Sequence, residues 1–391
     1  MRLLYVHNDY GKPSGEEHAA DSIADLLESH GHEVLWFRRS SAELAGSLAG
    51  KIKASIAGVH NPFAARALAR RLDETKPDVV QVQNLFPLLS PSIFKPIKQR
   101  GIPVVMRCPN YRLFCPNGLH LVRGRVCEKC LGFGREAWCI LRNCEGNLFK
   151  STGYAVRNAW ARITRRILDN VDVFIVQTAF QKEKFAGRGI PEAQIGIVPG
   201  LAAANAATEG FQPGDLVTFV GRVSPEKGIE DFLGAARLLP EMPFAVAGNT
   251  DAMPGIREQS PRNVSWLGFL EADGLEHLYR RSRVVVIPSR WYEGFPNVAV
   301  QAMMQARPVV AARIGAMTSV VENERTGLFF GAGDAADLAE KLASLYPDPE
   351  RCERLGGAGR TKASTHYSAD SVYASLAAVY ERAFQRHRNR S

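Results

Sequence analysis

Residues 216–230 read LVTFVGRVSPEKGIE, and this stretch predicts the architecture of the chain. Leu216–Val220 is a short apolar run typical of a buried parallel strand, and Ile229–Leu239 has helical spacing. The turn between them, residues 221–228, is bounded by glycines, so the stretch predicts a strand–turn–helix unit. Such units build parallel sheets that are covered by helices.

The same alternation of apolar runs and helical patterns extends in both directions. Downstream it predicts strands at 244–247, 264–267, 284–287 and 309–312, and helices at 275–281 and 296–306. Upstream it predicts strands at 3–7, 33–37, 79–82, 103–106 and 173–177, and helices at 16–29 and 154–168. The expected fold class is therefore α/β, with two doubly wound, Rossmann-like domains.

A change in composition sets the domain limits. Residues 201–214 are rich in Ala, Gly, Asn and Thr without periodicity, which predicts a linker. The N-terminal domain is then 1–200, with an insertion at 108–144, and the C-terminal domain is 215–368. Residues 369–391 predict a last helix that packs back toward the N-terminal domain. Two such domains would face a central cleft, and ligands of open α/β sheets bind beyond the carboxyl ends of the strands.

Two cations in the 221–228 turn, Arg222 and Lys227, predict a diphosphate-binding site. Arginine offers a planar fork of donors, lysine a point charge, and the following helix end free N–H groups. The alternative is a surface turn with solvated charges, because short motifs of this kind often occur by chance.

A second motif, WYEGFPN at residues 291–297, follows the predicted strand at 284–287. Pro296 suits the first turn of a helix, and Gly294 lets the backbone approach a ligand closely. Glu293 would then lie at the strand's carboxyl end, where it could accept hydrogen bonds from sugar hydroxyls, with Gln301 about one turn along the helix. The alternative roles are a helix-capping carboxylate for Glu293 and an ordinary exposed residue for Gln301.

At these two motifs the chain resembles the retaining family 4 glycosyltransferases of GT-B fold, and the resemblance runs through nearly the whole sequence. Its motifs are specific in combination, although each is weak alone. They are HNDY at 7–10, SGEE at 14–17, GHEV at 31–34, NLFP at 84–87, NYRL at 110–113, the 221–228 turn, EGFPNVAVQAMMQARPVV at 293–310, Gly315, and TGL at 326–328.

The resemblance implies transfer of a sugar from a nucleotide-diphosphate sugar to a hydroxyl of a glycan, a lipid-linked glycan or a small molecule, with retention of anomeric configuration. Arg222 and Lys227 would stabilise the leaving diphosphate, and Glu293 would bind the transferred sugar. The implied donor-binding residues are Gly15, Gly221, Gly248, Asn249, Phe269, Leu270, Gly294, Phe295, Asn297, Val298 and Gln301. The implied acceptor-side residues are Glu16, Asn84, Arg107 and Asn110. No catalytic metal ion is expected.

Four positions depart from the family's pattern. Gln301 replaces the second acid of a paired-glutamate motif, and close relatives often have histidine where this chain has Gln81, Gln83 and Pro109. Two other functions therefore stay open. The chain could be a nucleotide-sugar binder without catalytic activity, or an epimerase of the same fold that needs no acceptor sugar.

Six of the seven cysteines fall within the insertion at 108–144. Cys127 and Cys130, followed by Cys139 and Cys144, have the spacing of a tetrahedral zinc site, with Cys115 as a substitute for one of them. A structural zinc would stabilise a segment that has little core of its own. Free thiols and disulfides are the alternatives, and disulfides are rare in the cytosol.

The chain has 391 residues and a net charge of +9. It contains no nucleic-acid-binding motif, no apolar run long enough to span a bilayer, and no signal-peptide pattern at its start, so a cytoplasmic protein is expected. The predicted helix at 154–168 is basic and carries Trp160. It could rest on an anionic membrane surface, or it could pack Trp160 inward and leave its arginines in solvent.

Overall fold

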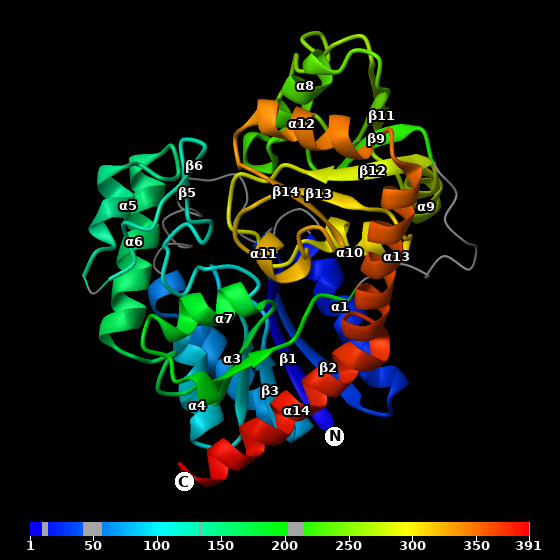
Figure 1. The fold of residues 1–391 in the computed structure, drawn as a ribbon. Helices are drawn as coiled ribbons and strands as arrows, with labels where there is room; N and C mark the ends of the chain where they lie inside the picture. Colours follow the sequence, from blue (N-terminus) through cyan, green and yellow to red (C-terminus); the bar gives the residue numbers. More distant parts are fainter. Residues whose placement is uncertain (10–14, 42–56, 133, 202–213, 391) are drawn as a thin grey trace. The chain divides into compact units, whose positions relative to one another are not determined.

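The computed structural model describes residues 1–9, 15–41, 57–132, 134–201 and 214–390. The chain divides into two compact units (Figure 1). One unit comprises residues 1–120, 127–201 and 372–391, and the other comprises residues 121–126 and 202–371. Most of the linker expected at 201–214 lies outside the described residues.

The N-terminal unit is built on a six-stranded parallel sheet with the order β2-β1-β3-β4-β7-β8. Its strands are β1 (Arg2–Asp9), β2 (Glu33–Ser40), β3 (Val79–Val82), β4 (Val104–Arg107), β7 (Val173–Val176) and β8 (Ile195–Ile197). Its helices are α1 (Gly15–Ser29), α3 (Pro62–Thr75), α4 (Phe94–Lys98), α5 (Ala137–Leu141), α6 (Leu148–Ile163), α7 (Ala179–Ala186) and α14 (Ala369–Arg388). Strands β3, β4 and β7 are buried along their whole length, as expected for a parallel sheet covered on both faces.

The C-terminal unit has a second six-stranded parallel sheet, with the order β11-β10-β9-β12-β13-β14. Its strands are β9 (Leu216–Val220), β10 (Phe244–Ala247), β11 (Val264–Gly268), β12 (Ser282–Ile287), β13 (Val309–Ala312) and β14 (Gly327–Phe330). Its helices are α8 (Ile229–Leu238), α9 (Ala272–Arg281), α10 (Asn297–Met304), α11 (Met317–Val320), α12 (Ala335–Leu345) and α13 (Pro349–His366). The two sheets confirm the predicted α/β class with two Rossmann-like units.

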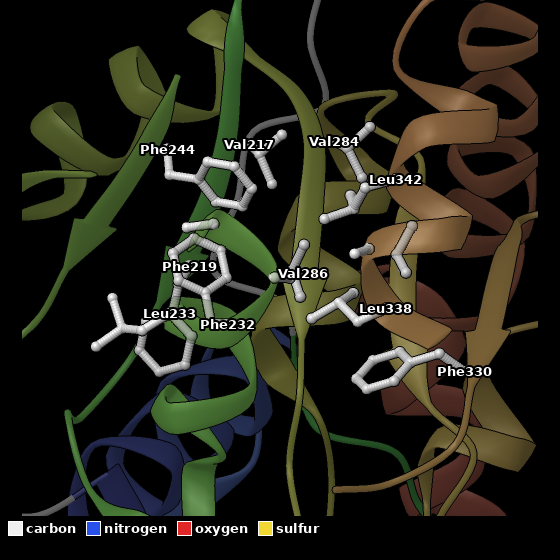
Figure 2. Packing of buried hydrophobic residues seen from close by; sticks show 14 of the residues in the cluster. Val217, Phe219, Phe232, Leu233, Phe244, Val284, Val286, Phe330, Leu338 and Leu342 are labelled. Carbon is white, nitrogen blue, oxygen red and sulfur yellow. The ribbon is translucent and has the colours of Figure 1, made fainter. Parts of the chain in front are cut away.

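Aromatic packing forms the centre of the C-terminal unit. Phe219 of β9, Phe232 of α8 and Phe244 of β10 are buried, with successive ring centroids 5.7 and 5.2 Å apart. Figure 2 shows these rings on one side of the strands, with Leu338 and Leu342 of α12 against Val284 and Val286. Removal of this apolar surface from water stabilises the unit, at roughly 1.5–3 kcal/mol for each fully buried large side chain.

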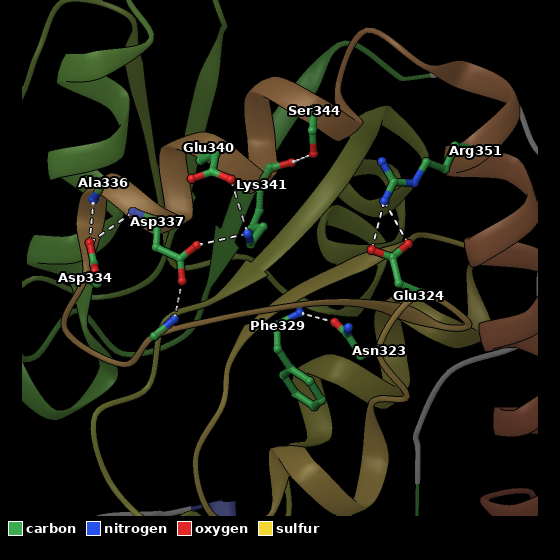
Figure 3. A network of polar contacts seen from close by, with 11 residues as sticks. Asn323, Glu324, Phe329, Asp334, Ala336, Asp337, Glu340, Lys341, Ser344 and Arg351 are labelled. Atoms are coloured by element: carbon green, nitrogen blue, oxygen red, sulfur yellow. Dashed lines mark hydrogen bonds and ion pairs between the residues drawn. The ribbon is translucent and has the colours of Figure 1, made fainter.

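Polar contacts order the edge of the same sheet (Figure 3). Asp334 caps the start of α12 and accepts hydrogen bonds from the backbone N–H groups of residues 336 and 337. Asp337 accepts from the Gly331 N–H and pairs with Lys341. These contacts fix α12 against the end of β14.

The C-terminal helix α14 belongs to the N-terminal unit from Val372 onward. The Tyr380 hydroxyl donates to Gln81 Oε1 at 2.7 Å and lies 3.2 Å from the Tyr5 hydroxyl. All three side chains are buried, so this helix completes the core next to β1 and β3.

Several predicted boundaries were wrong. The basic helix expected at 154–168 is α6, which begins at Leu148 behind an Asn147 cap and ends at Ile163. The helix expected at 275–281 begins at Ala272. Within the insertion, β5 (Leu121–Val122) pairs with β6 (Arg125–Val126). Helices α3, α7, α12 and α13 were not predicted, and the three glycines inside α13 explain why that helix was missed.

We predict that Gly356→Ala destabilises the C-terminal unit, whereas Gly357→Ala does not. A Cβ at Gly356 would lie 2.0 Å from the Ala306 carbonyl oxygen, while a Cβ at Gly357 meets nothing within 4 Å. Overpacking against backbone costs about 1–3 kcal/mol, and alanine is about 0.5–1 kcal/mol better than glycine in a helix. Urea unfolding of both variants measures this. Equal stability of the two variants would contradict the packing of α13 on residue 306.

Candidate active site

The strand order of the C-terminal sheet creates a crevice at the ends of β9 and β12. In chain order its six strands are arranged 3-2-1-4-5-6, so the order reverses between β9 and β12. Ligands of doubly wound sheets bind at this reversal, beyond the carboxyl ends of the strands. The loops that follow β9 and β12 are therefore the first place to look for a site.

The loop after β9 ends in a glycine that no other residue can replace without strain. Gly228 has φ +74°, and a Cβ there would lie 1.8 Å from the Pro288 carbonyl oxygen. Residues 225–227 form a single 3₁₀ turn before it. This close approach of the two loops brings Lys227 beside the loop after β12.

Lys227 and Glu293 form an ion pair at the reversal point. Lys227 Nζ lies 2.8 Å from Glu293 Oε1, and the Ser289 hydroxyl donates to the same oxygen. Glu293 is buried, with 7% of its surface exposed, and Lys227 is half-buried 5.8 Å from the centre of the Trp291 ring. A charged carboxylate and a cation are thus fixed next to each other within one pocket.

That pocket has a volume of about 150 Å³, and the beginning of α10 forms one wall. Residue 297 is the first residue of the eight-residue helix, and no side chain caps its N-terminal end. Free N–H groups at a helix N-terminus favour anions. The pocket therefore combines an ammonium group, a helix end and a carboxylate that can accept hydrogen bonds.

Arg222 lies outside the pocket that Lys227 and Glu293 line. Its side chain is 62% exposed and pairs with Glu226 at 2.8 Å, and Ser224 donates to the same carboxylate oxygen at 2.8 Å. The two cations of the 221–228 turn are thus each held by a separate glutamate.

Arg290 has an important position that the sequence analysis did not predict. Its guanidinium bonds to Asp231 Oδ2 at 2.8 Å and Glu230 Oε2 at 2.7 Å, and its backbone N–H donates to the Glu226 carbonyl. The hydrogen bonds to Asp231 raise the pKa of Arg290. This residue ties the loop after β12 to the start of α8. Its position shortly after β12, at the reversal point of the sheet, is the sequence feature from which this role could have been predicted.

The remaining donor-side positions fall into two groups. Gly221, Gly248 and Gly268 bring the ends of β9, β10 and β11 together: Gly221 N–H donates to Ala247, Gly248 N–H donates to Gly268, and a Cβ on Gly248 would lie 1.8 Å from the Gly221 oxygen. Beyond them, Asn249 bonds to Asp251, Phe269 is 73% exposed, and Leu270 packs partly against the core.

The α10 positions have mixed surroundings. Phe295 is buried against Tyr367, with ring centroids 5.5 Å apart, and Val298 packs against the same core cluster. Asn297 is exposed at the helix start, next to the half-buried Gly294. Gln301 accepts a hydrogen bond from the Tyr279 hydroxyl at 3.1 Å. Phe295 and Val298 nevertheless line the pocket together with Asn297, whose side chain is exposed.

The four acceptor-side residues line one pocket of about 40 Å³ in the N-terminal unit. Asn110 Nδ2 donates to Glu16 Oε1 at 3.0 Å, and Asn84 Nδ2 donates to the Asn8 carbonyl at 2.8 Å. Arg107 is buried, which lowers the pKa of its guanidinium, while nearby Glu16 opposes that shift. Pro109 lines the same pocket, and Gly15 is the first residue of α1.

Two of the unusual glutamines have different surroundings. Gln81 is the hydrogen-bond partner of Tyr380 within the core. The presence of glutamine at this position, where relatives often have histidine, is therefore explained by the packing of α14. Gln83 is also buried but lines the small pocket with Glu16.

Helices α5 and α6 expose an apolar surface. Phe149, Val156, Trp160 and Ile163 recur at helical spacing on one face of α6, and each is at least 42% exposed. With Leu148 of α6, and Trp138 and Leu141 of α5, they make seven of the thirteen large apolar side chains exposed in the described part of the chain.

The expectation that Trp160 packs inward is wrong, because Arg157 takes that place. The Arg157 guanidinium is buried, stacks on Phe86 and Tyr154 at 4.2 and 4.5 Å, and donates to the Pro116 carbonyl at 3.0 Å. Cation–π contacts and the hydrogen bond compensate for its removal from water.

Within the described ranges, His7, Asp9 and Glu17 are the one group of candidate metal ligands that approach within 4.8 Å of one another. His7 is buried at the end of β1, and its Nε2 lies 3.4 Å from Asp9 Oδ1 without hydrogen-bond geometry. Arg38 also contacts Asp9, at 3.6 Å, and places a competing positive charge there.

In the described part of the chain, no helix is both long and apolar enough to cross a membrane.

Two family models match the chain. The model described as glycosyl transferase 4-like domain matches residues 14–200, and the model described as glycosyl transferases group 1 matches residues 214–348. Together they include every residue of the two pockets described above.

Curated relatives share part of this match. A D-inositol 3-phosphate glycosyltransferase of Mycolicibacterium vanbaalenii is 30% identical over 263 residues, covering 58% of this chain and 56% of the relative. An alpha-D-kanosaminyltransferase of Streptomyces kanamyceticus is 27% identical over 184 residues, covering 44% and 46%. The chain thus spans about half the length of the curated relatives it matches.

Solved structures match over nearly the full length. Sucrose-phosphate synthase from Thermosynechococcus elongatus has a TM-score of 0.70 at 17% identity, covering 98% of this chain and 99% of that one. HepE of Anabaena, solved in complex with UDP, has a TM-score of 0.66 at 18% identity, covering 97% and 100%. The likeness shows that the fold is GT-B.

We predict that His7 makes the protein less stable in mild acid. Burial lowers the pKa of His7 below its ordinary value, although Asp9 partly opposes this. The unfolded chain then binds a proton that the folded chain does not, so stability is full above about pH 6.5 and falls as the pH drops toward the lowered pKa. His7→Asn should show a shallower loss of unfolding free energy between neutral pH and pH 5. The control His18→Asn removes an exposed histidine and should behave as wild type. Parallel pH profiles for all three proteins would contradict this assignment.

Proposed function

Because the chain belongs to the group 1 glycosyltransferases, we propose that it moves a sugar from a nucleoside-diphosphate sugar to a hydroxyl group, with retention of anomeric configuration. The single observation that carries this proposal is the Lys227–Glu293 pair beside the uncapped start of α10, at the reversal point of the C-terminal sheet. This arrangement suits a ligand with a diphosphate and a neutral, hydroxyl-rich part.

The donor would exchange partners with the side chains of the pocket. Lys227 and Arg222 are each neutralised by a glutamate, Glu293 and Glu226, before any ligand binds. A diphosphate offers both cations stronger, charge-assisted bonds. Glu293 would then accept hydrogen bonds from sugar hydroxyls, while Ser289 continues to orient its carboxylate.

The same cations would assist the chemistry. As the bond from sugar to phosphate breaks, negative charge grows on the diphosphate, and Lys227 with the α10 N–H groups is already positioned to stabilise it. The acceptor hydroxyl would approach from the face that the diphosphate leaves, and a departing phosphate oxygen would take its proton. Every step uses groups of the chain and the donor.

Base recognition is assigned to the ends of β10 and β11. Gly248 lets the ends of β9 and β10 approach closely, and the exposed ring of Phe269 offers a surface on which a base can stack. Gln301 lies one turn into α10 and carries an amide that can bond to a ribose hydroxyl.

The acceptor is assigned to the polar pocket of the N-terminal unit. Glu16, Asn84, Arg107 and Asn110 offer both donors and acceptors there. Such a set suits hydroxyls of a glycan or a lipid-linked glycan. The non-catalytic binder and the epimerase remain the competing functions: the first would bind donor without turnover, and the second would change the donor sugar with no acceptor present.

We further propose that the exposed face of α5 and α6 rests on an anionic bilayer. Its apolar side chains include two tryptophans, which favour the membrane interface. Residues 129–166 contain eight basic and two acidic residues, so the segment is strongly positive around this apolar face. Attraction to anionic lipid and burial of apolar surface would therefore act together.

We predict that one family of nucleotide sugars raises the melting temperature of the protein by several degrees. A ligand at 100 times its Kd stabilises the native state by about 2.7 kcal/mol. A thermal-shift screen of UDP-, GDP-, ADP- and dTDP-sugars identifies the base and sugar. Lys227→Ala and Arg222→Ala should abolish the shift, while Arg237→Ala, an exposed arginine of α8, should retain it.

Turnover separates the three functions. Glu293→Gln should keep nucleotide binding but lower sugar transfer by about 100-fold, because the carboxylate contacts the transferred sugar and not the base. NMR of the product reports the anomeric configuration. Binding without turnover would favour the binder, and epimerised donor in the absence of acceptor would favour the epimerase. Failure of all sugar nucleotides at millimolar concentration would overturn the proposal.

We predict that the double variant Trp160→Ser, Ile163→Ser binds anionic vesicles about tenfold more weakly than wild type, since each buried large side chain contributes roughly 1.5–3 kcal/mol and partial insertion yields a fraction of that. Co-sedimentation with phosphatidylglycerol vesicles at low salt measures this. The control Leu238→Ser removes an exposed leucine of the C-terminal unit and should leave binding unchanged. No sedimentation of the wild type would rule out membrane contact.

A further inference from the structure

A large pocket adjoins the small acceptor-side pocket of the N-terminal unit. Its volume is about 600 Å³, which lies within the usual range of ligand pockets, about 300–1,000 Å³. Its walls come from the loop after β4, the segment before α5, the end of α6 and the turns after α6 and α7. The pocket lies wholly within one compact unit, so its shape does not depend on the other.

The two pockets share three residues. Leu113, Ala161 and Ile167 line both the small pocket and the large one. Leu113 and Ala161 are half-buried, and Ile167 is buried beneath them. A molecule that enters the small pocket can therefore continue past these apolar side chains into the large pocket.

The small pocket has room for only part of an acceptor. Roughly 10–15 Å³ of such volume holds one water molecule, so about 40 Å³ admits the hydroxyl groups at one edge of a sugar and not a glycan. The rest of the acceptor then lies outside the small pocket. The large pocket is the adjoining space that can hold it.

One part of the large pocket is apolar. Leu113, Phe114 and Leu168 are half-buried in its wall, and the Phe114 ring packs edge-on against Phe185 with centroids 5.1 Å apart. Ile163 lines the pocket, is 65% exposed, and also belongs to the exposed apolar face of α6. The apolar surface thus continues from the pocket to that face, and an alkyl chain that follows it would be removed from water.

The rest of the described lining is positively charged. Arg162 Nε donates to Glu136 Oε1 at 2.5 Å, and Arg165 pairs with Asp169 at 3.0 Å. Three arginines and one glutamate line the pocket, which leaves an excess of two positive charges. Because Arg162 neutralises the one carboxylate, the pocket favours an anion.

Arg188 is the arginine of this lining that lacks a partner. It is half-buried in the turn after α7, and its Nε is buried without a hydrogen bond. No carboxylate within the described ranges pairs with its guanidinium. A buried donor without an acceptor costs free energy, and the oxygens of a phosphate match the planar fork of an arginine.

We propose that the acceptor is a sugar linked through phosphate to a long alkyl chain, and that the large pocket holds its phosphate and the start of its chain. The inference rests on the proposed sugar transfer. The phosphate would bond to Arg188, and the chain would follow Phe114 and Leu168 toward Ile163. An uncharged glycan would leave both the arginine and the apolar wall unused.

The reaction leaves the phosphate and the chain of the acceptor unchanged. The bond from the anomeric carbon to the donor diphosphate breaks, and a bond from that carbon to an acceptor oxygen forms. The proton of the acceptor hydroxyl leaves with the diphosphate. The large pocket therefore binds and positions the acceptor and takes no part in bond breaking.

Binding of farnesyl diphosphate, farnesol and inorganic pyrophosphate to full-length Lys227→Ala protein tests the site. This variant weakens the donor pocket, so diphosphate binding reports on the N-terminal unit. Farnesyl diphosphate carries both the charge and the chain and should bind at least tenfold more tightly than either of the others. Titration calorimetry without vesicles measures this. Equal binding of the three compounds, or of farnesyl diphosphate and farnesol, would overturn the site.

Variants of Arg188 test its contact with phosphate. Arg188→Gln should weaken farnesyl diphosphate binding about tenfold, the effect of losing one charge-assisted hydrogen bond, and Arg188→Lys should restore part of it. The control Arg70→Gln removes an exposed arginine of α3 and should bind as wild type. An unchanged melting-temperature shift with nucleotide sugar shows that each variant is folded. Wild-type binding by Arg188→Gln would overturn the assignment.

Sugar transfer tests whether the bound amphiphile is the acceptor. The donor identified by thermal shift is incubated with glucose, galactose or N-acetylglucosamine linked to farnesyl diphosphate, and with the matching sugar 1-phosphates. One chain-linked sugar should have a kcat/KM at least tenfold above that of its 1-phosphate. Equal values, or no transfer to any chain-linked sugar, would overturn this inference. The proposed sugar transfer would then still stand, because it is tested separately by donor binding.

Discussion

The ion pair between Lys227 and Glu293 joins two loops that are 66 residues apart in the chain. It forms because β9 and β12 are neighbours in the sheet although two other strands lie between them in sequence. Because the crossovers are right-handed, the helices that follow β9 and β12 cover opposite faces of the sheet. The loops after these two strands therefore diverge and leave a crevice at the carboxyl ends of the strands. The opposite charges then hold those loops in a single geometry.

Close backbone contacts also fix the positions of the loops in this region. At Gly228 and Gly248 a side chain of any size would meet a carbonyl oxygen within 2 Å. Arg290 adds a second link, from the loop after β12 to the acidic start of α8. The position of Lys227 therefore depends on the backbone contact at Gly228 and on the ion pairs of Arg290, a residue that does not line the pocket.

The fold and the centre of this site could be predicted from the sequence, because both follow from local patterns. Apolar runs of four or five residues marked the strands, and the 221–228 turn placed Lys227 at a strand end. Positions that depend on tertiary contacts could not be predicted this way. Arg222 pairs with Glu226 across one turn. Gln81 departs from the family's pattern in the sequence, and only the structure shows that it bonds to Tyr380, almost 300 residues later.

Arg157 and Trp160 show the same limit in α6, where hydrophobicity alone predicted the wrong orientation of the helix. An arginine is buried there because two aromatic rings and a carbonyl replace its water, and the tryptophan is left outside. A segment that turns its large apolar side chains outward has few left for a core of its own. The inner side of α5 is filled instead by cysteines and an alanine. The outward apolar face and the inward sulfurs are thus two consequences of one composition.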